Sequence, residues 1–147
     1  MKKLIGLVFL TLILISAIGP TSPKLQNAPS IEGTWELVSF NNYDGNEIIT
    51  VPATQGYRQI KMYYNGKVMW TRYVPQDSIE WFGYGSYSTT DTTLIERLEY
   101  MSASMRKIAN DSMVWTMKLE LKPDSYSQIF IDGEGNPISS ENYTRLD

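Results

Sequence analysis

One stretch of the sequence alternates between apolar and polar residues. Its apolar positions are Met113, Trp115, Met117, Leu119 and Leu121, and the residues between them are mostly polar. A period of two places each kind of side chain on its own face of a β-strand, so this strand has one buried face and one face in water. Antiparallel strands of this kind must close into a barrel or stack in two layers, because the apolar face and the strand edges need cover.

Strand patterns recur along the chain, and helix patterns are nearly absent. The dipeptide Asn65-Gly66 lies between two β-rich segments and predicts a two-residue hairpin turn. For residues 101–111 the sequence leaves two alternatives, a short helix or an irregular loop. The predicted strands are Thr34–Phe40, Tyr57–Tyr64, Lys67–Val74, Trp81–Thr89, Thr92–Tyr100, Met113–Leu121, Tyr126–Ile131 and Asn142–Leu146, with a turn over residues 41–46. We therefore predict an all-β fold, a single up-and-down antiparallel β-barrel of about eight strands, which is wide enough to hold one small ligand.

The first 22 residues have the pattern of a secretory signal peptide. Lys2 and Lys3 give a charged start, and the apolar run from Leu4 to Ile18 follows. A transmembrane anchor is the alternative, although the run is shorter than the roughly 20 residues that a span needs. Residues 23–30 read as a short tether and residues 31–147 as one barrel domain. We expect an exported, periplasmic or extracellular protein that meets the membrane only through its N-terminal segment.

The composition excludes several kinds of chemistry. The chain has no histidine and no cysteine, and its formal net charge is −3. Histidine-based proton transfer, His/Cys zinc sites, disulfides and a lipid-bearing cysteine are therefore excluded. Asp132, Glu134 and Asn136 alternate like the start of a calcium loop, but the glycine and the closing acid of such a loop are missing. Since there is also no basic stripe, we expect no metal, no cofactor and no nucleic-acid partner.

Aromatic and polar residues share strand faces that a closed barrel would turn inward. Glu96 shares a face with Leu94 and Leu98, and a carboxylate placed among such residues needs a partner. Arg72 is a candidate partner; alternatively, both side chains lie at the mouth of the barrel or in solvent. The candidate ligand-binding residues are Trp70, Arg72, Tyr87, Glu96, Tyr100, Trp115 and Met117.

Several short motifs suggest a family. Gly33-Thr34-Trp35 resembles the Gly-x-Trp signature of the calycin barrels, which include the lipocalins and the fatty-acid-binding proteins. The order of motifs along the chain also resembles a bacterial secreted lipocalin-like family of unknown function. The residues that carry this second resemblance are Met69–Tyr73, Gly83–Tyr87, Leu94–Tyr100 and Arg145-Leu146.

The resemblance implies a structural role for three residues. In calycins the tryptophan of the opening motif packs on an arginine from the last strand at the closed end, so Gly33, Trp35 and Arg145 become a structural signature. Cation–π attraction gives that contact a physical reason. The chain has no disulfide such as many lipocalins carry, and no two-helix lid pattern such as fatty-acid-binding proteins have. The identity of a ligand therefore does not transfer.

Three functions follow as expectations. The first is a protein that binds a small apolar or amphipathic molecule inside the barrel without catalysis. The second is an interaction module of the cell envelope with a filled core, whose function lies on its loops or rim. The third is an enzyme that uses Glu96 as acid and base with Tyr87 or Tyr100.

Overall fold

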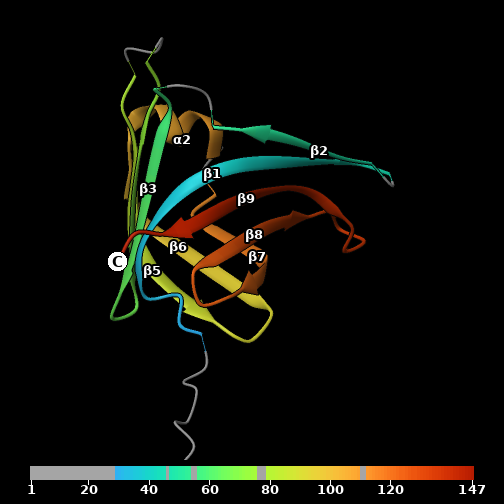
Figure 1. The fold of residues 1–147 in the computed structure, drawn as a ribbon. Coiled ribbons are helices and arrows are strands. Elements are labelled where there is room, and N and C mark those ends of the chain that lie inside the picture. Colours follow the sequence, from blue (N-terminus) through green and yellow to red (C-terminus); the bar gives the residue numbers. More distant parts are fainter. Residues whose placement is uncertain (1–28, 46, 54–55, 76–78, 110–111) are drawn as a thin grey trace, which may run out of the picture.

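The computed structural model describes residues 29–45, 47–53, 56–75, 79–109 and 112–147 (Figure 1). The predicted signal peptide and most of the predicted tether lie outside these residues. No helix in the described ranges is long and apolar enough to cross a bilayer. The elements are β1 (Gly33–Asp44), β2 (Glu47–Pro52), β3 (Arg58–Tyr64), β4 (Lys67–Tyr73), β5 (Trp81–Thr89), β6 (Thr93–Met101), α2 (Ala103–Ala109), β7 (Val114–Leu121), β8 (Ser125–Ile131) and β9 (Pro137–Arg145).

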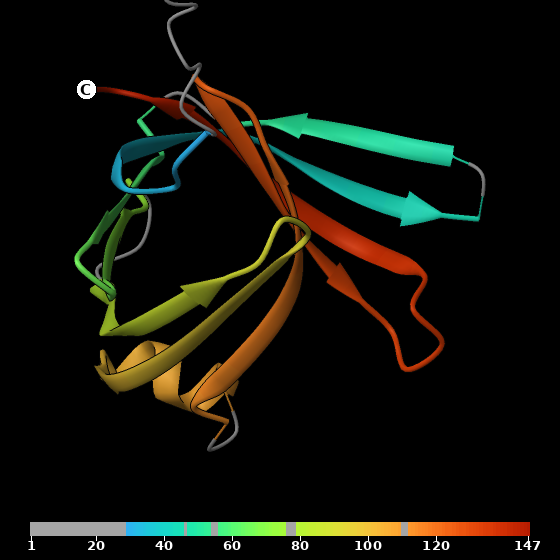
Figure 2. The ribbon, with the colours of Figure 1, turned by 90° about the horizontal axis from the view of Figure 1, so that it is seen from below.

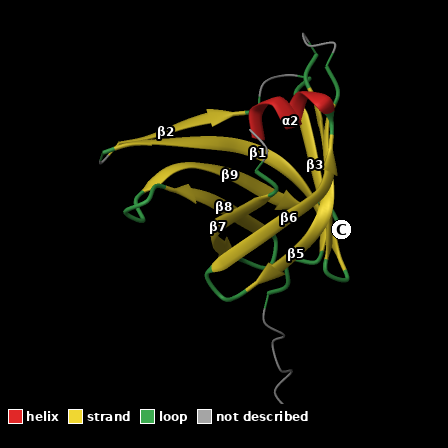
Figure 3. Ribbon diagram, turned by 180° about the vertical axis from the view of Figure 1, so that it is seen from behind, coloured by secondary structure: helices red, strands yellow, loops and turns green. Residues whose placement is uncertain are grey.

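The strands form one antiparallel sheet that closes on itself. Each strand from β3 to β8 pairs with the strand that follows it, and β1 pairs with both β3 and β9. The result is a closed eight-stranded up-and-down barrel with β2 as an extra strand on β1 (Figure 2). The predicted all-β barrel is therefore confirmed. The helix α2 lies beside the open end of the barrel (Figure 3).

The hairpin between β3 and β4 follows the sequence prediction. Asn65 and Gly66 have φ angles of 46° and 73°, which is the left-handed pair that a type I′ turn requires. This turn sets the register of the two strands, so that Lys61 lies opposite Trp70. The predicted helix or loop at residues 101–111 contains the short helix α2.

The predicted turn at residues 41–46 is wrong for residues 41–44, which belong to β1, and β2 was not predicted. The first strand continues to Asp44, because residues 39–42 pair with β9 on one edge and residues 39–44 pair with β2 on the other. Asparagine and aspartate favour turns in isolation, but two ladders of backbone hydrogen bonds outweigh that preference here. The turn begins only at Gly45.

Trp35 closes one end of the barrel. Its side chain is fully buried, its Nε1 donates a hydrogen bond to the carbonyl of Ile31 at 2.7 Å, and Tyr126 packs edge-on at 4.9 Å. The guanidinium carbon of Arg145 lies 4.0 Å from the centroid of the Trp35 ring, so the contact that the resemblance implies is present. Gly33 has φ 139°, and a Cβ there would collide with Arg145. Only a glycine therefore leaves room for this contact.

Arg145 also ties the N-terminal segment to the closed end. Its guanidinium donates hydrogen bonds to the carbonyls of Ser30, Glu32 and Pro123, at 2.6, 2.8 and 2.9 Å. These bonds hold the plane of the guanidinium in place above the indole. The cation–π contact is therefore preorganised by backbone acceptors.

We predict that Trp35→Ala lowers the free energy of unfolding by about 3–5 kcal/mol, because it empties the closed end of the barrel. Arg145→Ala should cost less. Chemical denaturation of both single variants and the double variant should give a coupling energy of about 0.5–2 kcal/mol, the range of a cation–π contact. Full additivity of the two substitutions would show that the Trp35 indole and the Arg145 guanidinium stabilise the protein independently.

Candidate functional site

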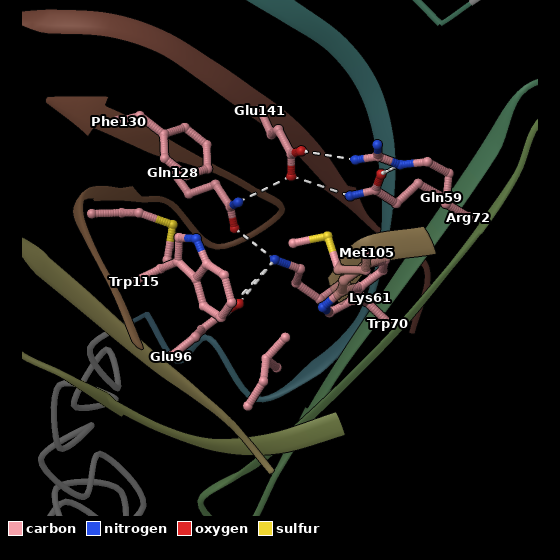
Figure 4. Close-up of a pocket in the computed structure, with 12 residues that line it drawn as sticks. Gln59, Lys61, Trp70, Arg72, Glu96, Met105, Trp115, Gln128, Phe130 and Glu141 are labelled. Atoms are coloured by element: carbon pink, nitrogen blue, oxygen red, sulfur yellow. Dashed lines mark hydrogen bonds and ion pairs between the residues drawn. The ribbon is translucent and has the colours of Figure 1, made fainter. Parts of the chain in front are cut away.

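A cavity of about 150 Å³ lies inside the barrel toward the open end (Figure 4). Six strands and α2 contribute its lining, and charged, amide, aromatic and thioether side chains all take part. All six charged and amide side chains join in one hydrogen-bonded group, and the rings and aliphatic chains lie around it. The lining residues are Gln59, Lys61, Trp70, Arg72, Glu96, Leu98, Met105, Trp115, Met117, Gln128, Phe130 and Glu141.

Strand alternation explains why polar residues point inward. On β3 the inward residues are Gln59, Lys61 and Tyr63, all buried, whereas Met62 and Tyr64 face out with exposed fractions of 48% and 77%. This strand therefore reverses the usual pattern of apolar inside and polar outside. Its polar inner face must find hydrogen-bond partners across the barrel, since buried polar groups are costly without them.

Lys61 and Glu96 form a buried ion pair. Their side chains are 3% and 6% exposed, and the Nζ atom of Lys61 lies 3.1 Å from Oε1 of Glu96. Lys61 also donates to Oε1 of Gln128 at 2.8 Å, and the hydroxyl of Tyr63 donates to Glu96 at 2.5 Å. A buried carboxylate is thus balanced by one cation and one neutral donor, which offsets its loss of hydration.

The partner of Glu96 is therefore Lys61, and the suggestion that Arg72 fills this role is wrong. Arg72 instead donates to Oε1 of Glu141 at 3.3 Å and to Oε1 of Gln59 at 2.6 Å. The reason is strand register: Lys61 and Arg72 both point inward, but Arg72 lies opposite Gln59, nearer the open end of the hairpin. Arg72 is also the more exposed cation, with 26% of its side chain accessible.

Glu141 is the centre of a second polar group. Its Oε2 accepts hydrogen bonds from Gln59 at 3.1 Å, from Gln128 at 3.0 Å and from Tyr143 at 2.5 Å. Gln128 joins the two groups, because its amide oxygen accepts from Lys61 and its amide nitrogen donates to Glu141. A continuous chain of hydrogen bonds therefore crosses the interior from Glu96 to Arg72 (Figure 4).

Burial keeps the tyrosines around these groups neutral. Desolvation raises the pKa of Tyr57 to about 12, while the nearby Arg72 acts in the opposite direction. Desolvation also raises the pKa of Tyr63, Tyr126 and Tyr143 well above the usual value, and neighbouring carboxylates add to the effect. Their hydroxyl groups consequently remain hydrogen-bond donors at neutral pH.

Aromatic and thioether side chains form the apolar walls. The Trp70 indole lies directly over Gly83, where a Cβ would come within 2.6 Å of Nε1 of the ring. Gly83 therefore makes the space in which Trp70 lies. Trp115, Phe130 and Met105 complete the wall and are each half-buried. Next to this wall, the rings of Tyr57 and Trp81 lie 5.9 Å from the guanidinium carbon of Arg72.

The structure brings together five of the seven predicted ligand-binding residues, namely Trp70, Arg72, Glu96, Trp115 and Met117. Tyr87 lies apart from them, packed on Tyr63 at 4.9 Å and hydrogen-bonded to Glu32.

Tyr100 lies outside the barrel, which corrects its predicted inward position. The pairing of β5 with β6 shifts by one residue between Tyr84 and Gly85, so Glu99 is an extra residue in β6. This bulge reverses the alternation after Leu98, and Tyr100 is 56% exposed and stacked on Tyr84. Gly85 permits the bulge, since a Cβ there would collide with the carbonyl of Arg97.

Four polar residues of the lining are not predicted from the sequence: Gln59, Lys61, Gln128 and Glu141. One signal could have found the first two. The Asn65-Gly66 turn sets the register of its hairpin, which places Lys61 opposite Trp70 and Gln59 opposite Arg72. If Trp70 and Arg72 point inward, so do their cross-strand partners. Within the described residues, no group of acidic side chains could hold a metal ion.

We predict that Glu96→Gln lowers the free energy of unfolding by about 3–5 kcal/mol, because it leaves the ammonium group of Lys61 buried without a counter-ion. The double variant Lys61→Met, Glu96→Gln should recover much of this loss. Glu99→Gln is the matched control, since Glu99 pairs with Lys67 at the surface. Equal losses for Glu96→Gln and Glu99→Gln in urea denaturation would contradict this prediction.

We also predict a loss of stability in alkali. A tyrosine whose pKa is raised by folding adds stability below its unfolded pKa of about 10, and that stability disappears as the pH rises through the folded pKa. The free energy of unfolding should therefore fall from about pH 10 toward pH 12. Denaturation curves at several pH values should show a smaller fall for Tyr57→Phe than for the exposed control Tyr64→Phe. Parallel curves would refute the role of Tyr57.

The fold resembles that of a solved protein structure. An uncharacterized protein from Bacteroides eggerthii superposes on this chain with a TM-score of 0.54 at 16% sequence identity, over 80% of this chain and all of that chain. No protein-family model matches the sequence. The search of curated proteins also gave no match. At this identity the likeness extends to the fold alone.

Proposed function

We propose that this chain binds a compact amphipathic molecule inside the barrel and does not transform it. The observation that carries the proposal is the cavity of about 150 Å³, where one hydrogen-bonded polar group lies against an aromatic wall. Ligand sites commonly combine apolar walls with a few polar groups that orient the ligand. The polar head would contact the amide of Gln128 or the guanidinium of Arg72, and the apolar part would lie against Trp70 and Trp115.

The size of the cavity restricts the ligand. A cavity of about 150 Å³ in a protein core accepts a molecule the size of benzene. A ring-sized ligand fits without rearrangement, whereas a long acyl chain does not. A larger ligand requires the half-buried side chains of Trp115 and Met105 to move outward.

The hydrogen bonds of the two carboxylates favour binding over catalysis. Glu96 is held by Lys61 and Tyr63, and Glu141 by Arg72 and three neutral donors. A general base needs a carboxylate oxygen within reach of the proton that it takes, and all four oxygens of Glu96 and Glu141 already accept hydrogen bonds within the barrel. The enzyme reading with Glu96 and either Tyr87 or Tyr100 has less support, because Tyr100 faces outward and Tyr87 lies outside the lining of the cavity.

A filled-core interaction module is the second candidate. One observation favours it: the cavity is smaller than the roughly 300 Å³ at which typical ligand pockets begin. In that case Trp70, Trp115 and Met117 serve the packing of the barrel, and function lies on the loops or the rim.

The lipocalin-like identity and the export of the chain are also proposals. The stacking of Arg145 on Trp35 beside Gly33 supports the first, since calycin barrels share this arrangement. The charged start and apolar run of residues 1–22 support the second.

The proposal predicts that an environment-sensitive apolar dye binds the native protein at one site per chain. Trp115→Ala should change the dye affinity by about tenfold or more, because the indole forms part of the wall. Tyr100→Ala is the matched control, an aromatic residue on the outer surface, and should leave the affinity unchanged. Native mass spectrometry of protein from its host should find a retained small molecule. Dye binding only under partly denaturing conditions would favour the interaction module instead.

A further inference from the structure

Strand β2 differs from every other strand of the sheet. All six of its residues are exposed, including Ile48, Ile49 and Val51 with exposed fractions of 60%, 52% and 41%. Among the described residues it pairs with β1 alone, so its second edge carries no partner strand. The hairpin of β1 and β2 projects away from the barrel (Figures 1 and 2). Exposed edges of this kind attract another strand, and between Ile48 and Val51 this one has no charged side chain, proline or bulge to prevent that.

The hydrogen bonds with β1 show which backbone groups point to the free edge. Ala53 donates its N–H to the carbonyl of Val38. Bonded and non-bonded pairs alternate along an antiparallel ladder, so Val51 and Ile49 also bond to β1. Ile48 and Thr50 therefore direct their N–H and C=O groups away from β1. Pro52 lies on the same edge but has no N–H to offer.

We propose that this edge pairs with β2 of a second copy of the chain, antiparallel, about a two-fold axis at Ile49. Ile48 then lies opposite Thr50 of the second copy, and Thr50 lies opposite Ile48 of the second copy. Each of these pairs exchanges two backbone hydrogen bonds, so every N–H and C=O that Ile48 and Thr50 present is satisfied. This inference is independent of the proposed ligand.

The two nearest self-pairings fit less well. An axis at Thr50 puts Pro52 opposite Ile48 of the second copy, and that carbonyl then finds no donor. An axis at Ile48 puts Thr50 opposite residue 46, beyond the strand. The axis at Ile49 also places Glu47 opposite Val51 of the second copy, so the two carboxylates do not meet. The edge is therefore complementary to itself in one register, which is the reason for choosing a second copy over another extended chain.

The side chains of the pairing are compatible with burial. Ile49 meets Ile49 of the second copy on one face, and Ile48 meets Thr50 of the second copy on the other. β-branched pairs across neighbouring strands stabilise a sheet. Six residues on each side form a small interface, so we expect a dimer that depends on protein concentration rather than a permanent one.

A disulfide between copies tests the register, because the chain contains no natural cysteine. Ile49 and its symmetry mate form a non-bonded pair whose Cα atoms lie about 4.5 Å apart, within the range of a disulfide. Mild oxidation of Ile49→Cys should give a covalent dimer. Val51→Cys, on the same face of the same strand, should stay monomeric, since four residues separate the two thiols by about 14 Å. Equal cross-linking of both variants, or none of Ile49→Cys, overturns the proposal.

The second test measures the dissociation constant of the dimer by analytical ultracentrifugation of the full chain, with no cysteine introduced. Thr50→Pro removes an N–H that faces the free edge and leaves the bonds to β1 in place. It should raise the dimer dissociation constant roughly tenfold, because one hydrogen bond is lost on each side of the axis. Thr50→Val keeps the backbone N–H and should retain the dimer. Circular dichroism checks that both variants fold. A protein that is monomeric at all concentrations, or a dimer that Thr50→Pro leaves intact, overturns the proposal.

Discussion

The double pairing of β1 is the constraint on which the rest of the molecule depends. Its first residues pair with β3 and its other edge pairs with β9, which closes the barrel. Closure removes the edges of eight strands and turns their inner faces toward one another. The last residues of β1 leave β3 and pair with β2 instead. The buried interior of the barrel and the exposed extra strand β2 are thus both consequences of the length of β1.

The interior of the barrel is polar at its centre and apolar around it. Burying two carboxylates and two cations is costly, and the structure offsets the cost by giving each charge an opposite charge and at least one neutral hydrogen-bond partner. Such a network does little for stability compared with an apolar core of equal volume. It restricts which side chains fit together, however, because each member needs a defined partner at a defined place.

The sequence predicts the backbone of this protein better than its interior. Alternation on β7 and the Asn65-Gly66 turn locate strands reliably, because both depend on local geometry. The outward position of Tyr100 depends on a bulge in β6, and the hydrogen-bond partners of Lys61 lie 35 and 67 residues away in the chain. The strand β2 escaped prediction because its pattern carries no buried face. Local patterns contain no information on contacts of this kind.

The amide of Gln128 gives the interior a direction. Its oxygen faces the ammonium of Lys61 and its nitrogen faces the carboxylate of Glu141, so a rotation by 180° would oppose like partial charges at both ends. The amide therefore acts as an oriented dipole between the ammonium group of Lys61 and the carboxylate of Glu141. The ion pair of Lys61 with Glu96 and that of Arg72 with Glu141 are consequently linked by side chains alone, through one amide group.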